Sequence, residues 1–141
     1  MPISKEIHLK SRPVGTPTAD NFELIETEIP DPGTNEVLVQ NLYMSVDPYM
    51  RGQMRENWPT GQVLMGGALG KVIASNNPEF LKGDYVSNGS AWREYFLSGG
   101  QDLTKIDASL APLSAFLGVM GMPGLTAYGG LLVTGELKEG E

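Results

Sequence analysis

The segment NLYMSVDPYMRGQ, residues 41–53, joins an apolar strand pattern to a proline corner. Pro48 removes a backbone donor and keeps Asp47 out of the helical region, so we expect the strand to end here. Tyr49 follows on this rigid corner, where its flat ring with a polar tip could line a pocket for a planar ligand. A tyrosine packed against the rim of the core is the alternative interpretation.

The flanking sequence predicts short strands separated by turns. The chain holds 18 glycines and 10 prolines, which fix turns and favour short strands over long helices. The imperfect alternation of residues 37–46 indicates a bulge or burial on both faces. Together the strands predict a small barrel or sandwich. They are expected at residues 6–10, 24–29, 37–46, 67–75, 85–86 and 91–97.

Toward the C-terminal end the pattern changes from strand to helix. Ser109 could cap a short helix that has Pro112 in its first turn. Pro123 could open a second helix that runs to about Val133, and Gly135 follows as a stop signal. The predicted fold class is therefore mainly β with C-terminal helices.

Composition narrows the possible functions. The 141 residues carry a formal net charge of −7, which argues against a nucleic-acid partner. No apolar run of membrane-spanning length and no signal-peptide pattern is present, so no membrane partner is expected. Because the chain has no cysteine, disulfides are impossible and a cytoplasmic location is the natural expectation.

The sequence offers few side chains for acid–base or metal chemistry. Without cysteine, a four-cysteine zinc site cannot form, and no metal cluster is expected. The single histidine, His8, alternates with Ile7 and Leu9, which predicts that it lies on the solvent side of a first strand. Arg51 is expected to form a structural ion pair, with contact to an anionic ligand as the alternative.

Two glycine-rich stretches lack the spacing of a nucleotide-binding loop. In MGGALGKV, residues 65–72, no strand precedes and no helix follows, so close packing inside a barrel is the favoured interpretation. In GVMGMPGLTAYGGLL, residues 118–132, the glycines fall in helical context. Thr126 and Tyr128 lie near the start of that helix, where a ligand amide could meet them. An amphipathic helix with two incidental polar residues is equally compatible.

The last residues, LVTGELKEGE, stop on a polar turn without a closing strand or helix. We expect a chain cut at a domain boundary rather than a frayed terminus. Leu125, Leu131 and Leu132 would then expose apolar surface, which predicts self-association.

Three motifs together resemble a known family. They are SRPVGTPTADNFEL (11–24), NLYMSVDPYMRGQM (41–54) and GVMGMPGLTAYGGLL (118–132). In this order they are similar to the zinc-independent medium-chain dehydrogenase/reductases, nearest to the NADPH-dependent alkenal, prostaglandin and curcumin double-bond reductases. The resemblance implies that residues 1–141 form a GroES-like catalytic domain, a partly open β-barrel. It also implies a Rossmann cofactor domain after residue 141.

The resemblance implies reduction of the C=C bond of an α,β-unsaturated aldehyde or ketone. NADPH would deliver a hydride to the β-carbon, and the enolate would then be protonated. By position, Tyr49 and Met50 would line the substrate cleft, and Met122, Gly124 and Thr126 would lie near the nicotinamide. The catalytic residue is unassigned, because the family's enolate-binding tyrosine lies in the later half.

Two other functions are compatible with the sequence. The chain could be a stand-alone GroES-like β-barrel that binds a small molecule or partner without catalysis, or half of a quinone reductase. Gly129 and Gly130 stand where relatives often have a larger residue, which leaves substrate size open. The resemblance implies a homodimer for a full-length enzyme, and we expect the 141 residues alone to bind NADPH weakly and to be inactive.

Overall fold

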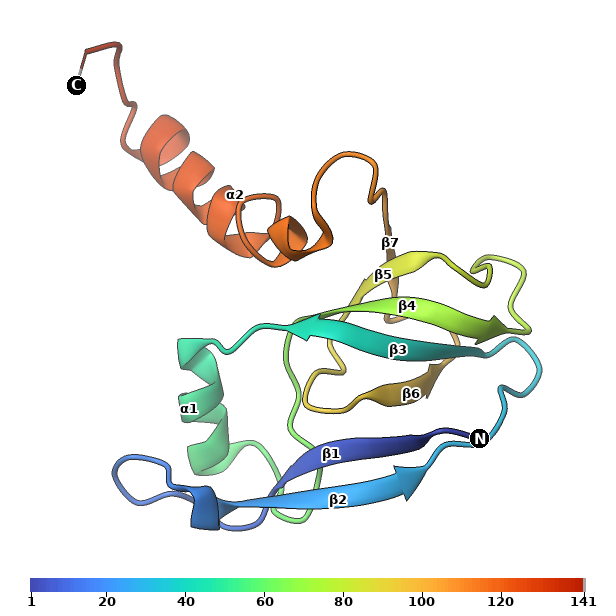
Figure 1. The fold of residues 1–141 in the computed structure, drawn as a ribbon. Coiled ribbons are helices and arrows are strands. Elements are labelled where there is room, and N and C mark those ends of the chain that lie inside the picture. Colours follow the sequence, from blue (N-terminus) through green and yellow to red (C-terminus); the bar gives the residue numbers. More distant parts are fainter. Residues whose placement is uncertain (141) are drawn as a thin grey trace. The chain divides into compact units, whose positions relative to one another are not determined.

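The structure, a computed structural model, describes residues 1–140 and divides the chain into two compact units. Unit 1 is Met1–Asp107, and unit 2 begins at Ala108. All of the β-strands in the described residues belong to unit 1, and unit 2 is helical (Figure 1). The mainly β class with C-terminal helices is therefore confirmed.

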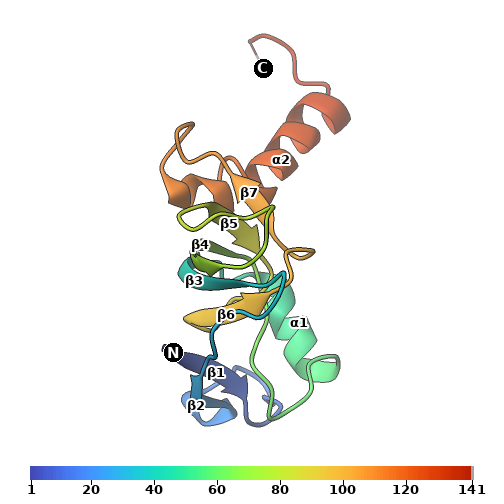
Figure 2. The ribbon, with the colours of Figure 1, turned by 90° about the vertical axis from the view of Figure 1, so that its right-hand side faces the viewer.

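Unit 1 contains two antiparallel sheets (Figures 1 and 2). The first pairs β1 (Ile3–Leu9) with β2 (Phe22–Glu28), and the short 3-10 helix η1 (Ala19–Asn21) precedes β2. The second has five strands in the order β6-β3-β4-β5-β7. In chain order, their bounds are Val37–Met44 (β3), Ala68–Ser75 (β4), Tyr85–Asn88 (β5), Tyr95–Ser98 (β6) and Thr104–Ile106 (β7).

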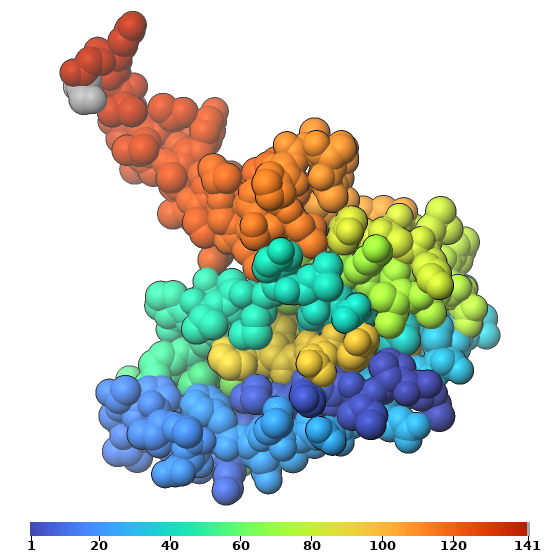
Figure 3. Space-filling view, viewed as in Figure 1, coloured from blue at the N-terminus to red at the C-terminus, as the bar shows by residue number. Residues whose placement is uncertain are grey.

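Ser4 connects the two sheets. Its fully buried hydroxyl donates to the Tyr95 carbonyl and accepts the Tyr95 N–H, both at 3.0 Å. The Glu94 N–H donates to the Lys5 carbonyl at 3.1 Å in the same place. The start of β6 therefore lies against β1 while β6 itself pairs with β3, and Figure 3 shows its surface between those two strands.

Most predicted strands lie where the pattern places them, with two differences. The bulge predicted in residues 37–46 is confirmed by register shifts between β3 and β4, at Leu38/Val39 and at Asn41/Tyr43. Strand β7 was not predicted, because three residues are too few to show an alternation. The segment before β6 is also irregular, so that strand starts later than predicted.

The proline corner opens a helix that the sequence analysis did not predict. The strand ends at Met44 and Asp47 is extended (φ −115°, ψ 149°), as expected before a proline. Helix α1 (Pro48–Glu56) then begins directly at Pro48. A proline suits this first position, because its missing N–H would have no partner inside the helix. Three residues separate the end of the strand at Met44 from the start of the helix at Pro48.

The predicted solvent-facing position of His8 is wrong. Strand β1 has buried residues on both faces: Leu9 is fully buried on one, and Ser4 and Glu6 are buried on the other. The His8 side chain is 18% exposed. Its imidazole lies 3.0 Å from the Glu6 carboxylate and 3.1 Å from the Gly61 carbonyl. Alternation locates the two faces of a strand but does not show which of them is covered.

Two apolar clusters form the core of unit 1. One lies within the five-stranded sheet and its turns, and comprises Val37, Val39, Val72, Phe80, Val86, Phe96 and Leu103. The other lies beneath α1, and comprises Leu9, Met50, Met54 and Leu64, with Ile7, Phe22, Trp58 and Trp92 packed against it. In the MGGALGKV stretch, a Cβ on Gly70 would lie 2.5 Å from Val39 Cγ1, which confirms close packing there.

Unit 2 contains the 3-10 helix η2 (Leu113–Leu117), helix α2 (Met122–Tyr128) and a π-helix, η3 (Gly129–Thr134). The second predicted helix therefore changes its hydrogen-bonding pattern at Gly129. Leu125, Leu131 and Leu132 are exposed, and self-association through them stays a prediction. Among the described residues, no helix has the length and apolar character needed to cross a bilayer.

Candidate functional site

Short polar contacts fix the start of α1, which carries the candidate site. The Ser45 hydroxyl donates to the Asp47 carboxylate at 2.6 Å. The Met50 N–H donates to the Asp47 carbonyl at 3.0 Å, and the Asp47 N–H donates to Met50 Sδ at 3.5 Å. These contacts set the direction in which the first turn presents its side chains.

The helical period then separates two residues that the sequence analysis placed together. Met50 and Met54, four positions apart, are buried in the core beneath the helix. Tyr49 and Gln53, also four positions apart, line a surface cavity, and Tyr49 is 47% exposed. Tyr49 therefore lines a cavity, and its role as a substrate contact stays a prediction. Met50 is only 2% exposed and does not line this cavity, so its role as a substrate contact stays a prediction.

The cavity beside Tyr49 has a volume of about 300 Å³ and belongs entirely to unit 1. One wall is built from side chains of α1 and the residues after it, and the other from backbone at three glycines. It is lined by Tyr49, Gln53, Trp58, Met65, Gly66, Gly67 and Gly89. Such a volume and a largely apolar lining are typical of small-molecule sites.

The glycine wall has one filled position and one open position. A Cβ on Gly66 would lie 2.2 Å from Met50 Cε and 3.6 Å from the Tyr49 hydroxyl, so the helix packs directly on this glycine. A Cβ on Gly89 would meet nothing within 4 Å. The cavity therefore has free space beside the backbone at Gly89.

Gln53, Trp58 and Gly89 were not predicted as lining residues. Gln53 could have been found by counting four positions on from Tyr49 if the helix had been recognised. Trp58 and Gly89 reach the cavity only through tertiary packing. Local sequence carries no signal for such contacts.

Arg51 binds backbone carbonyls, and the predicted ion pair is wrong for the described residues. Its Nη2 donates to the Gly15 carbonyl at 2.7 Å and to the Pro13 carbonyl at 3.4 Å. Arg12, which belongs to the loop before β2, donates from its Nη1 to the Met54 carbonyl of helix α1 at 3.1 Å. The two arginines therefore clamp the loop before β2 to helix α1.

The three residues expected near a nicotinamide lie together in the first turns of α2. A Cβ on Gly124 would lie 1.7 Å from the Val119 carbonyl oxygen, so the tight turn itself requires this glycine. The Thr126 hydroxyl donates to the Met122 carbonyl at 2.8 Å, which leaves its lone pairs able to accept a ligand N–H. Met122 is exposed. Their roles toward a cofactor stay predictions.

Titratable groups with clearly altered behaviour lie outside the Tyr49 cavity. Burial lowers the pKa of the Arg93 guanidinium, and the nearby Glu6 carboxylate opposes this shift. Hydrogen bonds from Lys105 and from the Leu81 N–H lower the pKa of Asp84. No group of three or more potential metal-binding side chains occurs in residues 1–140. The Tyr49 cavity itself combines a largely apolar lining with one phenol, from Tyr49, and one amide, from Gln53.

Comparison with known proteins gives consistent matches along the chain. Residues 5–106 match the family model described as the N-terminal domain of oxidoreductase. The NADPH-dependent curcumin reductase of Escherichia coli is 44% identical over 140 residues, 94% of this chain and 40% of that protein. The NADP(+)-dependent 2-alkenal reductase of Nicotiana tabacum is 38% identical over 150 residues, 98% of this chain and 43% of that protein.

A solved structure gives the same result. The crystal structure of CurA from Vibrio vulnificus in complex with NADPH matches with a TM-score of 0.85 and 44% identity, over 97% of this chain and 42% of that one. The chain spans less than half the length of each of these three proteins. We conclude that the chain belongs to the medium-chain dehydrogenase/reductase family, in the branch of the NADPH-dependent curcumin and alkenal reductases.

Proposed function

We propose that this chain is the substrate-binding part of an NADPH-dependent reductase that saturates the C=C bond of α,β-unsaturated aldehydes and ketones. The observation that carries the proposal is the cavity between Tyr49 and the glycine wall, in a chain whose relatives are reductases. A conjugated carbonyl compound is largely apolar with one polar end, and the cavity is largely apolar with two polar side chains, Tyr49 and Gln53.

The residues of the cavity suggest how such a substrate is held. Tyr49 presents its ring to the conjugated plane and its hydroxyl to the carbonyl end. The Gln53 carboxamide, on the same face of α1, offers a second donor to a carbonyl oxygen. Donors at that oxygen favour the enolate, because negative charge develops there during the reaction. The open position at Gly89 leaves room for the body of the substrate.

NADPH, when bound, supplies the hydride to the β-carbon, and a proton from solvent or a side chain completes the saturated product. Met122 and Thr126 fit contact with the carboxamide end of such a cofactor, because one is exposed and the other keeps free lone pairs. Residues 65–72 and 118–132 lack the spacing of a phosphate-binding loop, so we propose that another part of the protein binds the phosphates.

The test is an assay on the protein encoded by the complete natural reading frame. Benzylideneacetone and NADPH should give benzylacetone, which gas chromatography separates from the unsaturated alcohol. Menadione serves as the quinone substrate in the same assay. Formation of the alcohol, turnover of menadione alone, or no turnover of either compound would each contradict the proposal.

A pair of variants tests the role of the cavity. Tyr49→Phe keeps the ring and removes the hydroxyl, so kcat/KM for benzylideneacetone should fall about tenfold, the equivalent of one hydrogen bond. Tyr85→Phe removes a hydroxyl from β5, outside the cavity, and should leave kcat/KM unchanged. Equal effects of the two substitutions would show that Tyr49 has no specific role.

A further inference from the structure

The glycine wall of the Tyr49 cavity combines the residues just before β4 with the start of the loop 89–94, which joins β5 to β6. Backbone hydrogen bonds connect the two parts. The Gly66 N–H donates to the Gly89 carbonyl at 3.0 Å, and the Ala91 N–H donates to the Gly66 carbonyl at 3.2 Å. The position of the loop 89–94 therefore sets one boundary of the cavity.

This loop contains a strained residue. Trp92 has φ of 62°, in the left-handed region that bulky residues rarely adopt. Such a conformation persists only where the surrounding structure fixes it. The Trp92 carbonyl accepts the Ile7 N–H at 2.8 Å, which fastens the later part of the loop to β1. The part next to Gly89 is held by different contacts.

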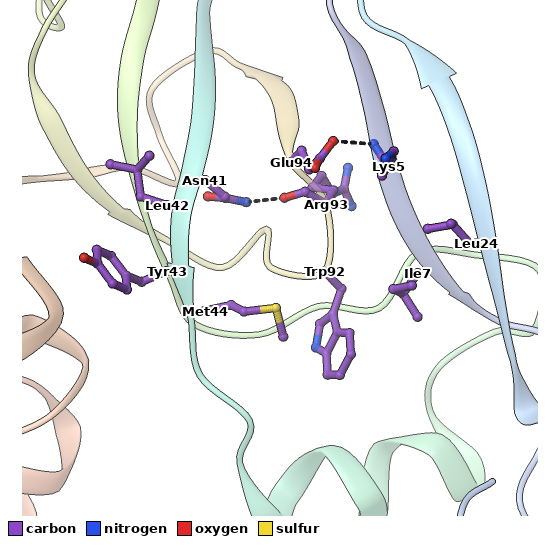
Figure 4. Close-up of a pocket in the computed structure, with 10 residues that line it drawn as sticks. All are labelled: Lys5, Ile7, Leu24, Asn41, Leu42, Tyr43, Met44, Trp92, Arg93 and Glu94. Carbon is purple, nitrogen blue, oxygen red and sulfur yellow. Dashed lines mark hydrogen bonds between the residues drawn. The ribbon is translucent and has the colours of Figure 1, made fainter. Parts of the chain in front are cut away.

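The side chain of Asn41, on β3, provides those contacts. Its Nδ2 donates to the Ser90 carbonyl at 2.8 Å and to the Arg93 carbonyl at 3.0 Å. Figure 4 draws the bond to Arg93. Asn41 lies opposite Gly70 of β4, and a Cβ on Gly70 would lie 3.3 Å from Asn41 Oδ1. The glycine therefore leaves room for the amide.

Asn88, the last residue of β5, completes the network. Its Nδ2 donates to Asn41 Oδ1 at 3.0 Å, and its own Oδ1 accepts the Ser90 N–H at 2.8 Å. The Asn41 amide thus uses its oxygen and both of its N–H groups. The two amides also hold the N–H and the carbonyl of Ser90, the residue next to Gly89. A buried polar network that is satisfied in this way fixes one local structure.

We propose that the Asn41–Asn88 pair determines how wide a substrate the Tyr49 cavity accepts, because it fixes the loop that carries Gly89. The inference rests on the proposed reductase function. Neither asparagine lines the Tyr49 cavity, so both are positioning residues and not substrate contacts. Gly89 has no side chain, so the width of the cavity depends on where its backbone lies. Without the pair, the loop can move away from Tyr49 and admit wider enones.

Asn77 provides a matched control beyond the opposite end of β4. Its Nδ2 also donates to two carbonyls, of Asn35 at 3.1 Å and of Gly99 at 3.0 Å. Its Oδ1 also accepts one N–H, from Glu79 at 2.8 Å. Asn77 does not line the Tyr49 cavity. Asn77→Ala therefore removes the same set of bonds as Asn41→Ala and leaves the loop 89–94 untouched.

The test uses the complete natural protein with two enones, benzylideneacetone and its naphthyl analogue, which has a second fused ring. The ratio of their kcat/KM values does not depend on how much of a variant is folded. Asn41→Ala should lower the preference for benzylideneacetone about tenfold, a change in the range that pocket shape produces. Asn77→Ala should leave the ratio unchanged. If Asn41→Ala does not fold, Asn88→Ala should shift the ratio in the same direction.

Amide hydrogen exchange, measured without substrate by mass spectrometry, gives a readout that does not depend on activity. Exchange in residues 89–94 should be about tenfold faster in Asn41→Ala than in Asn77→Ala. Faster exchange with an unchanged ratio would show that the pair holds the loop without limiting the substrate, and would overturn the inference. Unchanged exchange would also overturn it. No turnover of benzylideneacetone by the natural sequence would instead refute the proposed function, and the inference would fall with it.

Discussion

Gly70 provides a quantitative test of how the sheet beside the candidate site is packed. A Cβ at this position would lie 2.5 Å from Val39 Cγ1 and 2.9 Å from the Gln40 carbonyl oxygen. Neither atom can withdraw freely, because Val39 is fully buried and Gln40 pairs with Lys71 of β4. Overpacking a core costs about 1–3 kcal/mol. Since a backbone carbonyl is involved, we expect Gly70→Ala to lower the free energy of unfolding by about 3 kcal/mol, at the upper end of that range.

Urea unfolding monitored by tryptophan fluorescence measures this loss. With an m-value of about 2 kcal/mol per molar urea, the midpoint should fall by roughly 1.5 M. Gly89→Ala is the matched control, because its Cβ meets nothing within 4 Å. That variant should be neutral or up to about 1 kcal/mol more stable, through a less flexible unfolded chain.

A double-mutant cycle identifies the atom that causes the loss. Val39→Ala removes the nearest contact, so Gly70→Ala should cost at least about 1 kcal/mol less in that background than in the natural sequence. The reasoning would be refuted if Gly70→Ala changed stability by less than about 0.5 kcal/mol, or if the two substitutions were simply additive.

Three further expectations follow from the same structure. Gly89→Leu should fill the Tyr49 cavity, so kcat/KM of the complete protein for benzylideneacetone should fall at least tenfold. The melting temperature should stay unchanged, because the added side chain has free space. An unaltered kcat/KM would show that the substrate binds elsewhere. Arg51→Met should lower the free energy of unfolding in urea by about 1–3 kcal/mol, because the carbonyls of the loop before β2 lose a charged donor. Proteolysis of that loop should also become faster. An unchanged rate of proteolysis would contradict this expectation. Because the pKa of Asp84 is lowered in the folded state, its stabilising contribution is present above the ordinary value of 3.8 and lost as pH falls below it. Lys105→Met removes the ion pair with Asp84 and should lower the free energy of unfolding by less than about 1 kcal/mol at neutral pH. In acid, the urea midpoints of this variant and of the natural sequence should become equal. A difference that stays constant with pH would argue against a stabilising Lys105–Asp84 pair.

The strands could be predicted from sequence because their signals are local. The turn at residues 30–33 and the alternation that follows it fix β2 and β3 to within about two residues. Helix α1 was missed because its first residue is a proline, which was interpreted only as the end of the preceding strand although proline also suits the first position of a helix. The two methionines four positions apart carried the helical period, and nine residues proved enough for it.

The site was only half predictable, for a related reason. Tyr49 was found because a motif marked it, whereas Gln53 depends on knowing that the segment is helical. Gly89 lies at the cavity because β4 pairs with β5, and Ala68 at the start of β4 lies opposite Asn88 at the end of β5. This pairing brings the glycines just before β4 close to Gly89, just after β5. His8 was misplaced because what covers β1 comes from distant parts of the chain. These features depend on tertiary contacts that a local pattern does not contain.

The spacing of the DPYMR motif has a physical explanation in this structure. Helix α1 begins at Pro48, directly after the extended Asp47, so the three residues that follow point in successive directions about 100° apart. Tyr49 points to the cavity, Met50 to the core behind Gly66, and Arg51 to the loop before β2. Because the three roles are fixed by one helical turn, each substitution in the motif should disturb one partner and leave the other two in place. The single turn that Pro48 begins therefore contributes both to the packing of unit 1 and to the cavity beside Tyr49.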